Sequence, residues 1–164
     1  VDLMMSDTVF PVCAPEVLVK HPISNVDDLR GQHLIHDDTM IWSRESQNLG
    51  LPDWSAWLAF ARAHDIDGSR GLRIQSSSSV MVAAVAGLGV ALARSCIAEP
   101  YLTTGQLVQP LAIEYPRRFA YYLVCDPRAL ARLPVAQVHA WLLKEGDATM
   151  EIDRIGSAST EDRE

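Results

Sequence analysis

The sequence predicts an α/β sandwich with a mostly parallel sheet. Short apolar runs alternate along the chain with segments whose apolar residues recur every three or four positions, which is the order of strands and helices in such folds. The 164 residues are 48% hydrophobic and 21% charged, an ordinary composition for a globular domain. No apolar run reaches the roughly 18 to 20 residues of a membrane span.

The first half of the chain carries a strand with a proline in it and a helix with a clear cap. Pro11 suits an edge or crossing strand. Asp53 is the expected N-cap of a helix on which Trp54 and Trp57 share the apolar face, so both rings are expected in the core. The expected elements are a strand VFPVC, helical turns PEVLVKH and DDLRGQ, a buried strand HLIHD, an irregular loop over 39–52, and the helix WSAWLAFARAH.

The second half continues the alternation. Ser95 is the expected cap of one helix and Pro134 the first residue of another, whose Val138 and Trp141 share an apolar face and which Gly146 ends. The expected elements are a strand LRIQ, a helix from about Ser79 to Ala86 that Gly87 stops, a strand GVALA, a helix from Ser95 to near Gly105, strands LVQPLAI and FAYYLVC, and the helix VAQVHAWLLKE.

The net charge of −7 is concentrated at the C-terminal end. Residues 147–164 hold six acidic residues and two arginines, a net charge of −4, which leaves −3 for the rest of the chain. Neither part has the basic stripe that nucleic-acid binding needs, and the polar tail is expected to be disordered. Three cysteines without metal-site spacing favour a reducing compartment, which is the cytoplasm.

The stretch RIQSSSSVMVAAVAGLGVAL at 73–92 offers three kinds of chemistry. A nucleophilic serine would need a Gly-x-Ser-x-Gly elbow, and no glycine flanks Ser76–Ser79 at that spacing. A dinucleotide fingerprint needs strand, glycines and helix in that order, whereas Gly87 and Gly89 follow a helix and precede a strand. We therefore interpret Gly87 as a helix C-cap and expect no catalysis.

The third possibility is a ligand held at the start of a helix. Ser77–Ser79 lie where a strand gives way to a helix, and ligands bind beyond the carboxyl ends of parallel strands. Free N–H groups and the helix dipole at such a start favour a carboxylate or another anion. A single capping serine with its neighbours in water explains the run equally well. The residues alone leave both interpretations open.

The segment HLIHDD at 33–38 has the residue types of a metal site but not the geometry. On a strand, His33 and His36 point to opposite faces, so no metal site is expected there. Tyr121 and Tyr122 also point to opposite faces of their strand, so one can be in the core while the other reaches a cleft.

Seven segments in order resemble LysR-type transcriptional regulators, most closely the branch that includes the glycine-cleavage activator and the β-lactamase regulator. The likeness extends over about residues 7–145. The segments are PVCAPEVL, DDLRGQHLIHDD, DWSAWLAFA, LRIQSSSSVMVAAVAGLGVALA, LTTGQLVQPL, AYYLVC and VHAWLLKE.

The resemblance implies an effector-binding region with the type 2 periplasmic-binding-protein fold, in which a small effector lies between two α/β lobes. The N-terminal helix-turn-helix and the first half of lobe I are expected to be absent, which leaves lobe II nearly complete and lobe I partial, with apolar surface exposed. The implied ranges are 1–14 for the end of lobe I and the first crossing strand, 15–107 for lobe II, 108–118 for the second crossing, 119–146 for the returning part of lobe I and 147–164 for the tail.

The resemblance also implies residue roles and partners. Effector contacts would come from Ser76, Ser77, Ser78 and Ser79, and from Tyr121 (a one-residue slip would put Tyr122 there). Cys13, Ala14 and Pro15 would line the hinge. The implied partners are a small-molecule effector, DNA through the absent N-terminal domain, and further copies of the intact protein, with no cofactor, metal or membrane. The alternatives are a solute-binding module of the same fold and, more remotely, a serine hydrolase.

Overall fold

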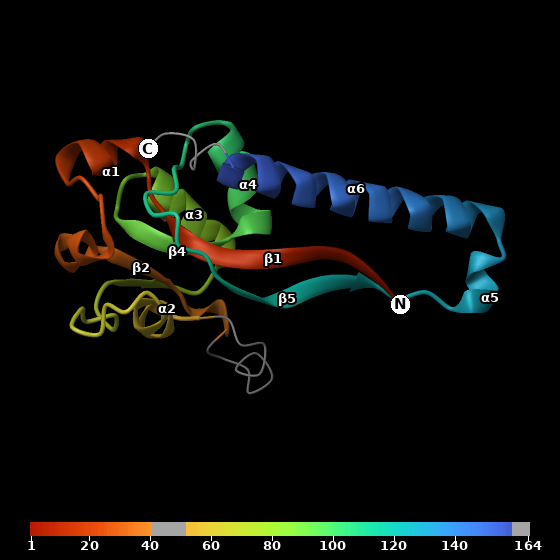
Figure 1. Ribbon diagram of the computed structural model, residues 1–164, viewed down its shortest axis with the longest axis horizontal. Coiled ribbons are helices and arrows are strands. Elements are labelled where there is room, and N and C mark those ends of the chain that lie inside the picture. The colour runs from red at the N-terminus through yellow and green to blue at the C-terminus, as the bar shows by residue number, and fades with distance from the viewer. Residues whose placement is uncertain (41–51, 159–164) are drawn as a thin grey trace. The chain divides into compact units, whose positions relative to one another are not determined.

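The computed structural model describes residues 1–40 and 52–158; for Met40, 116–119 and 147–158 it describes the backbone alone. Strands and helices alternate as the sequence predicts, and the predicted α/β class is confirmed (Figure 1). The elements, in which η marks a 3-10 helix, are β1 (Asp2–Val12), α1 (Pro15–Lys20), η1 (Val26–Gly31), β2 (Leu34–Asp37), η2 (Asp38–Met40), α2 (Trp54–Phe60), β3 (Leu72–Ile74), α3 (Ser77–Val85), β4 (Val90–Arg94), α4 (Ser95–Thr103), β5 (Tyr115–Leu123), α5 (Pro127–Leu130) and α6 (Leu133–Ala158).

The strands form one five-stranded sheet in the order β3-β2-β4-β1-β5. Strand β2 is parallel to both of its neighbours, with Ile35 opposite Leu72 of β3 and Ala91 of β4. Strand β1 runs antiparallel to β4, and Val9 lies opposite Arg94. Because β2, β3 and β4 are parallel, their carboxyl ends lie at one edge of the sheet, where ligands bind in α/β folds.

Alternate residues of β2 and β4 point to opposite faces of the sheet and enter two separate hydrophobic clusters. Leu34 and Val90 belong to the first cluster, under α1, η1 and α2, and Ile35 and Ala91 belong to the second, under α3 and α4. Figure 1 shows α3 above and α2 below β2. The sheet is therefore covered by helices on both faces, which is the predicted sandwich.

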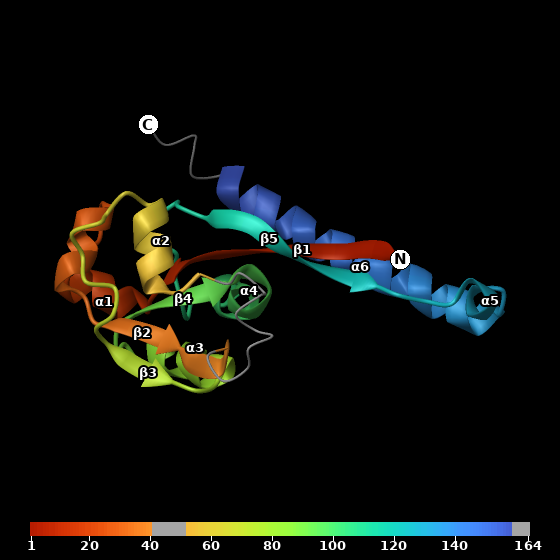
Figure 2. The ribbon, with the colours of Figure 1, turned by 90° about the horizontal axis from the view of Figure 1, so that it is seen from below.

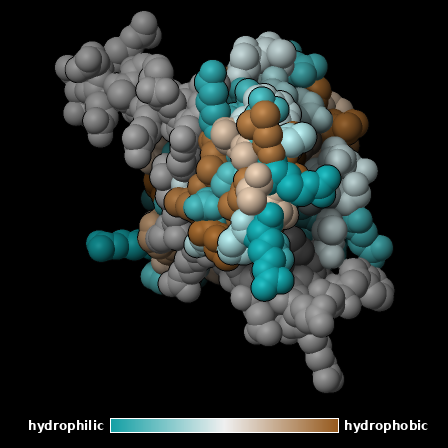
Figure 3. Space-filling model, turned by 90° about the vertical axis from the view of Figure 1, so that its right-hand side faces the viewer, coloured by the Kyte–Doolittle hydropathy of each residue, from teal (hydrophilic) through white to brown (hydrophobic). Residues whose placement is uncertain are grey.

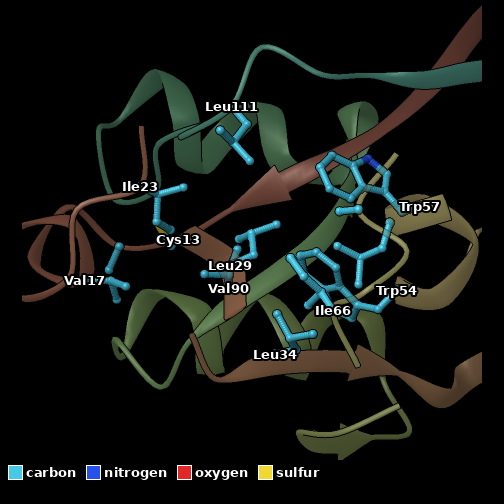
Figure 4. Packing of buried hydrophobic residues seen from close by; sticks show 13 residues of the cluster. Cys13, Val17, Ile23, Leu29, Leu34, Trp54, Trp57, Ile66, Val90 and Leu111 are labelled. Atoms are coloured by element: carbon cyan, nitrogen blue, oxygen red, sulfur yellow. The ribbon is translucent and has the colours of Figure 1, made fainter. Parts of the chain in front are cut away.

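Both predicted core tryptophans lie in the first cluster (Figure 4). Trp54 is 1% and Trp57 0% exposed, and their rings meet edge to face with centroids 5.8 Å apart. Trp54 also donates its Nε1–H to the carbonyl of Ile35, 3.0 Å away, which ties α2 to β2. Asp53 caps α2 as expected, since its carboxylate accepts from the N–H of Ala56 at 2.7 Å.

The chain divides into two compact units, Val1–Asp7 with 117–164 and Thr8–Pro116. Both boundaries fall inside strands, β1 and β5. The second unit, Thr8–Pro116, contains both hydrophobic clusters. The first unit leaves Val138 and Trp141 of α6 exposed at 55% and 57%, although the sequence pattern puts them on one apolar face. Figure 3 views the molecule from the side on which Figure 1 labels α5. Hydrophobic residues are visible at this surface among hydrophilic ones. The lobe boundaries given by the family resemblance stay predictions.

Helix α6 differs from its prediction, because it continues through Gly146 to Ala158. Residues 147–158 belong to this helix, and 159–164 lie outside the described residues; the disorder expected for 147–164 stays a prediction. Gly146 is buried, and a Cβ there would stand 2.2 Å from the carbonyl oxygen of Met4. The glycine permits close packing of the helix against β1 and does not end it.

Three smaller predictions were also wrong. Residues 107–113 (LVQPLAI) form no strand; Val108 makes a single bridge to Cys13, since Pro110 interrupts any ladder. Ser95 does not cap α4: Arg94 is the N-cap residue, and the Ser95 hydroxyl instead accepts the N–H of Thr8 at 3.3 Å. Helix α2 ends at Phe60, since the chain turns at Arg62 with a φ of 63°. Most of the irregular loop predicted for 39–52 lies outside the described residues.

Candidate functional site

The serine run begins helix α3 two residues earlier than predicted. Ser76 is the N-cap residue, and its hydroxyl accepts the N–H of Ser79 at 3.3 Å. Ser77 is the first residue of the helix and is half-buried, whereas Ser78 and Ser79 are exposed. The capping interpretation is therefore confirmed for Ser76, and the four serines occupy different environments.

The two glycines after α3 serve the backbone. Gly87 follows the helix with a φ of +72°, the left-handed conformation of a C-cap glycine. Gly89, with a φ of +155°, passes so close to the next strand that a Cβ would stand 2.0 Å from the carbonyl oxygen of His33. The adjacent Val90 donates its N–H to that same oxygen at 2.8 Å. These glycines join a helix to a strand, as the sequence predicts.

Ser77 faces a carboxylate of the protein itself. Its hydroxyl donates to Oδ2 of Asp37, the last residue of β2. The other oxygen, Oδ1, accepts the backbone N–H of Thr39 at 3.0 Å and also the Thr39 hydroxyl. Asp37 is thus held by three donors at the carboxyl end of β2 and the amino end of α3.

The neighbouring carboxylate is neutralised by an arginine. Asp38 accepts two parallel bonds from Arg73, one from Nε and one from Nη2, each 2.8 Å long. The Asp38 side chain is 14% and the Arg73 side chain 49% exposed, so the pair borders water. This two-pronged contact links the ends of β2 and β3.

These side chains border a pocket of about 410 Å³ within the unit Thr8–Pro116. The pocket lies at the carboxyl ends of β2, β3 and β4 and beside the starts of α2, α3 and α4 (compare the strand ends in Figure 2). Of the four predicted serines, Ser77 alone lines it. The lining residues are Val9, Ile35, His36, Asp37, Asp38, Pro52, Asp53, Trp54, Ala56, Arg73, Ser77, Met81, Leu92, Ala93, Arg94 and Ile97.

The other residues with predicted roles lie elsewhere. Tyr121 belongs to β5 in the other unit and is 39% exposed, and Tyr122 is 60% exposed, so neither ring enters the core. Cys13 and Ala14 are buried between β1 and α1, with Pro15 as the first residue of that helix. Cys13 exchanges two backbone hydrogen bonds with Val108, and burial raises the pKa of its thiol to about 11. Their hinge and effector roles stay predictions.

The two histidines of the HLIHDD segment have separate surroundings. His36 is buried and its Nε2 lies 2.9 Å from the carbonyl oxygen of Arg70, whereas His33 is exposed. Among residues 1–40 and 52–158 no three metal-binding side chains come together. In the same part of the chain, no helix has the length and apolarity to cross a membrane.

Sequence reasoning missed most of the polar residues of this pocket. Asp37, Asp38, Arg73 and Arg94 line it, and the interpretation of 33–38 weighed only a metal site. One signal was available, since Asp37 ends a buried strand and Asp38 follows it, and the carboxyl end of such a strand lies at the ligand-binding edge of the sheet.

The fold and pocket can be compared with known proteins. The family model of the LysR substrate binding domain matches residues 1–147. The chain belongs to this family. The family predicted from the seven sequence segments is therefore confirmed.

Relatives of this LysR substrate-binding domain are named as transcriptional regulators. The glycine cleavage system transcriptional activator of Escherichia coli (strain K12) is 28% identical over 153 residues, which cover 92% of this chain and 46% of that protein. The HTH-type transcriptional regulator DsdC of the same strain is 32% identical over 108 residues, 65% of this chain and 33% of that protein. The chain spans less than half the length of these relatives.

Solved structures of the same fold include two effector domains. The effector domain of the transcriptional regulator AmpR of Pseudomonas aeruginosa has a TM-score of 0.63 at 21% identity, covering 93% of this chain and 68% of that chain. The AmpR effector binding domain from Citrobacter freundii has a TM-score of 0.62 at 18% identity, covering 90% and 67%. These likenesses establish the fold that the LysR resemblance implied.

Proposed function

We propose that this LysR substrate-binding domain is the effector-sensing part of a longer DNA-binding regulator of transcription. A small molecule binds at the pocket beside Ser77 and shifts the protein between two arrangements of its parts, which changes how the intact oligomer contacts DNA. Such a shift requires the effector to prefer one arrangement. DNA binding belongs to an N-terminal domain, the protein works in the cytoplasm, and the domain itself performs no catalysis.

The pocket is the observation that carries this proposal. A volume of about 410 Å³ is in the range of small-molecule sites, and its lining combines apolar side chains with a few polar ones. Its place at the carboxyl ends of parallel strands is the usual ligand position in α/β sheets. Membership of the LysR substrate-binding family supports binding as the role of that pocket.

The arrangement around the serines speaks against hydrolysis. A serine nucleophile needs a base that takes its proton, usually a histidine. Ser77 donates instead to the Asp37 carboxylate, and Ser76 caps α3. His36, the histidine that lines the pocket, has its Nε2 against the Arg70 carbonyl. Binding therefore explains the site better than catalysis.

The test is a metabolite screen by thermal shift on the intact protein, followed by titration of each hit. A bound effector raises the melting temperature by an amount that grows with the logarithm of its concentration once that concentration exceeds Kd. We expect Ser77→Ala and Met81→Ala, which alter the pocket lining, to weaken a hit, and Ser78→Ala, which changes an exposed neighbour, to leave it unchanged.

A second measurement addresses regulation. Gel-shift assays with DNA from upstream of the gene are expected to show binding by the intact protein and a change in affinity or complex mobility on adding the hit. A hit whose affinity is the same in Ser77→Ala and Met81→Ala would contradict the pocket assignment. Intact protein that binds no DNA would contradict the regulatory role.

A further inference from the structure

The pocket beside Ser77 contains the carboxylate of Asp37. The serine run alone favours an anionic ligand at this place, which the protein's own negative charge would repel. Ser77, the serine that lines the pocket, donates its hydroxyl hydrogen to Asp37 and so does not offer it to a ligand, while Ser76 uses its hydroxyl oxygen to accept the N–H of Ser79. A helix start carries a partial charge of about +0.5. The full negative charge of Asp37 beside it more than offsets that attraction.

The three carboxylates that line the pocket are not equivalent. Asp38 is neutralised by the two-pronged contact with Arg73. Asp53 is used as the cap of α2, accepting from the N–H of Ala56. Among the side chains that the structure describes, none from an arginine or lysine forms an ion pair with Asp37; its donors are the neutral groups of Ser77 and Thr39. Asp37 therefore adds a negative charge beside Ser77, in a lining that also includes Arg94.

Apolar side chains surround this charge. Met81 of α3 lines the pocket beside Ser77, and other apolar contributors come from β1, β2, β4, α2 and α4. Apolar walls lower the local dielectric constant and so strengthen a charge–charge contact. The apolar lining residues include Val9, Ile35, Met81, Leu92 and Ile97.

We infer that the pocket takes a small ligand with an ammonium or other cationic group at Asp37 and an apolar body against Met81. This inference rests on the proposed effector function and names the class of effector. It replaces the anion favoured by the serines alone. A ligand carboxylate at the same place would meet the Asp37 carboxylate, and like charges at contact distance repel.

The experiment compares two probes of nearly equal size and opposite charge, propylammonium and propionate. Both are titrated into the intact protein at a constant ionic strength of about 0.15 M, because screening changes with salt. The readout is methyl NMR of Ile35, Met81 and Ile97, which line the pocket. The methyls of Val85 and Leu88, which line a second pocket of about 390 Å³, report binding elsewhere.

We expect propylammonium to shift the pocket methyls at lower concentration than propionate. Asp37→Asn keeps the size of the side chain and removes its charge, so propylammonium affinity should fall by about tenfold, the effect of roughly 1.4 kcal/mol. Asp27→Asn is the matched control: Asp27 is an exposed carboxylate outside the pocket, so the same loss of charge there should leave the affinity unchanged.

Three results would overturn the inference. They are equal or stronger binding of propionate, unchanged propylammonium affinity in Asp37→Asn, and no shift of the pocket methyls by propylammonium at any attainable concentration. The proposed function is judged separately, since an effector from the metabolite screen that depends on Ser77 and Met81 but carries no cation would retain that function and reject only the cationic class.

Discussion

Ser77 donates its hydroxyl to the carboxylate of Asp37, forty residues earlier in the chain. The bond joins the first residue of α3 to the last residue of β2 at the edge of the pocket. The preceding Ser76 caps the same helix, and the following Ser78 faces water. Adjacent serines therefore have separable effects on binding and on stability.

Ser76→Ala is expected to lower the free energy of unfolding by about 1 kcal/mol, because the N–H of Ser79 loses its acceptor. Ser76→Gly should lower the free energy of unfolding by only about a few tenths of a kcal/mol. Glycine tolerates the cap conformation and leaves the N–H of Ser79 accessible to water. Urea denaturation measures both. Ser78→Ala, at the exposed neighbour, serves as the control and should change stability by less than about 0.5 kcal/mol. Equal losses in Ser76→Ala and Ser78→Ala would contradict the capping assignment.

Arg73→Ala is expected to lower the free energy of unfolding by about 1 kcal/mol, because it leaves the mostly buried Asp38 without its two-pronged partner. Adding Asp38→Asn to that variant should recover part of the loss, since the unpaired charge is then removed. A double-mutant cycle by chemical denaturation gives the coupling energy. Strictly additive losses would show that the two side chains do not interact.

The Cys13 thiol predicts a loss of stability at high pH. Burial raises its pKa from the ordinary 9.0 to about 11. Between these values the thiol of the unfolded chain loses its proton while that of the folded chain keeps it, so the unfolded state binds fewer protons and stability falls as pH rises. Below pH 9.0 the contribution is present, and at the upper end of the window the loss reaches about 2 kcal/mol.

Urea denaturation across this pH window under reducing conditions tests that effect. Lysines and tyrosines also titrate there, so the quantity to compare is the slope of stability against pH in each variant. Cys13→Ala should flatten the slope, whereas Cys125→Ala, at a half-buried position, should retain it. A slope that is the same in wild type and Cys13→Ala would show that the thiol contributes nothing to it.

Helix ends and the buried face of a helix could be predicted from the sequence, because they depend on residues close together in the chain. Asp53 before α2 and Gly87 after α3 act through backbone groups within one turn, so their residue types suffice to predict them. The periodicity of Trp54 and Trp57 likewise predicts one buried helix face. The family resemblance came from the same local segments in order.

Contacts between distant segments could not be predicted in this way. The partner of Ser77 is Asp37 and that of Asp38 is Arg73, thirty-five to forty residues away in each case. Their positions follow from the order of β3, β2 and β4 in the sheet, which the sequence does not show. The sign of the charge at the start of α3, and with it the class of ligand, depends on these contacts.

Gly146 gives a test in which helix propensity and packing predict opposite results. In an open helix, Gly→Ala stabilises by about 1 kcal/mol. At Gly146 a Cβ would stand 2.2 Å from the carbonyl oxygen and 2.9 Å from the carbonyl carbon of Met4, so helix or strand must move. We expect Gly146→Ala to lower the free energy of unfolding by about 1 to 3 kcal/mol, the usual cost of overpacking.

Gly31→Ala is the matched control, since nothing lies within 4 Å of a Cβ at that position. It should leave the midpoint of urea unfolding nearly unchanged or raise it slightly, because alanine restricts the unfolded chain. If Gly146→Ala instead raised the midpoint of urea unfolding, as Gly31→Ala is allowed to do, α6 and β1 would not approach closely in solution. In that case Gly146 would act only as a residue of low helix propensity, and the close contact with Met4 would be rejected.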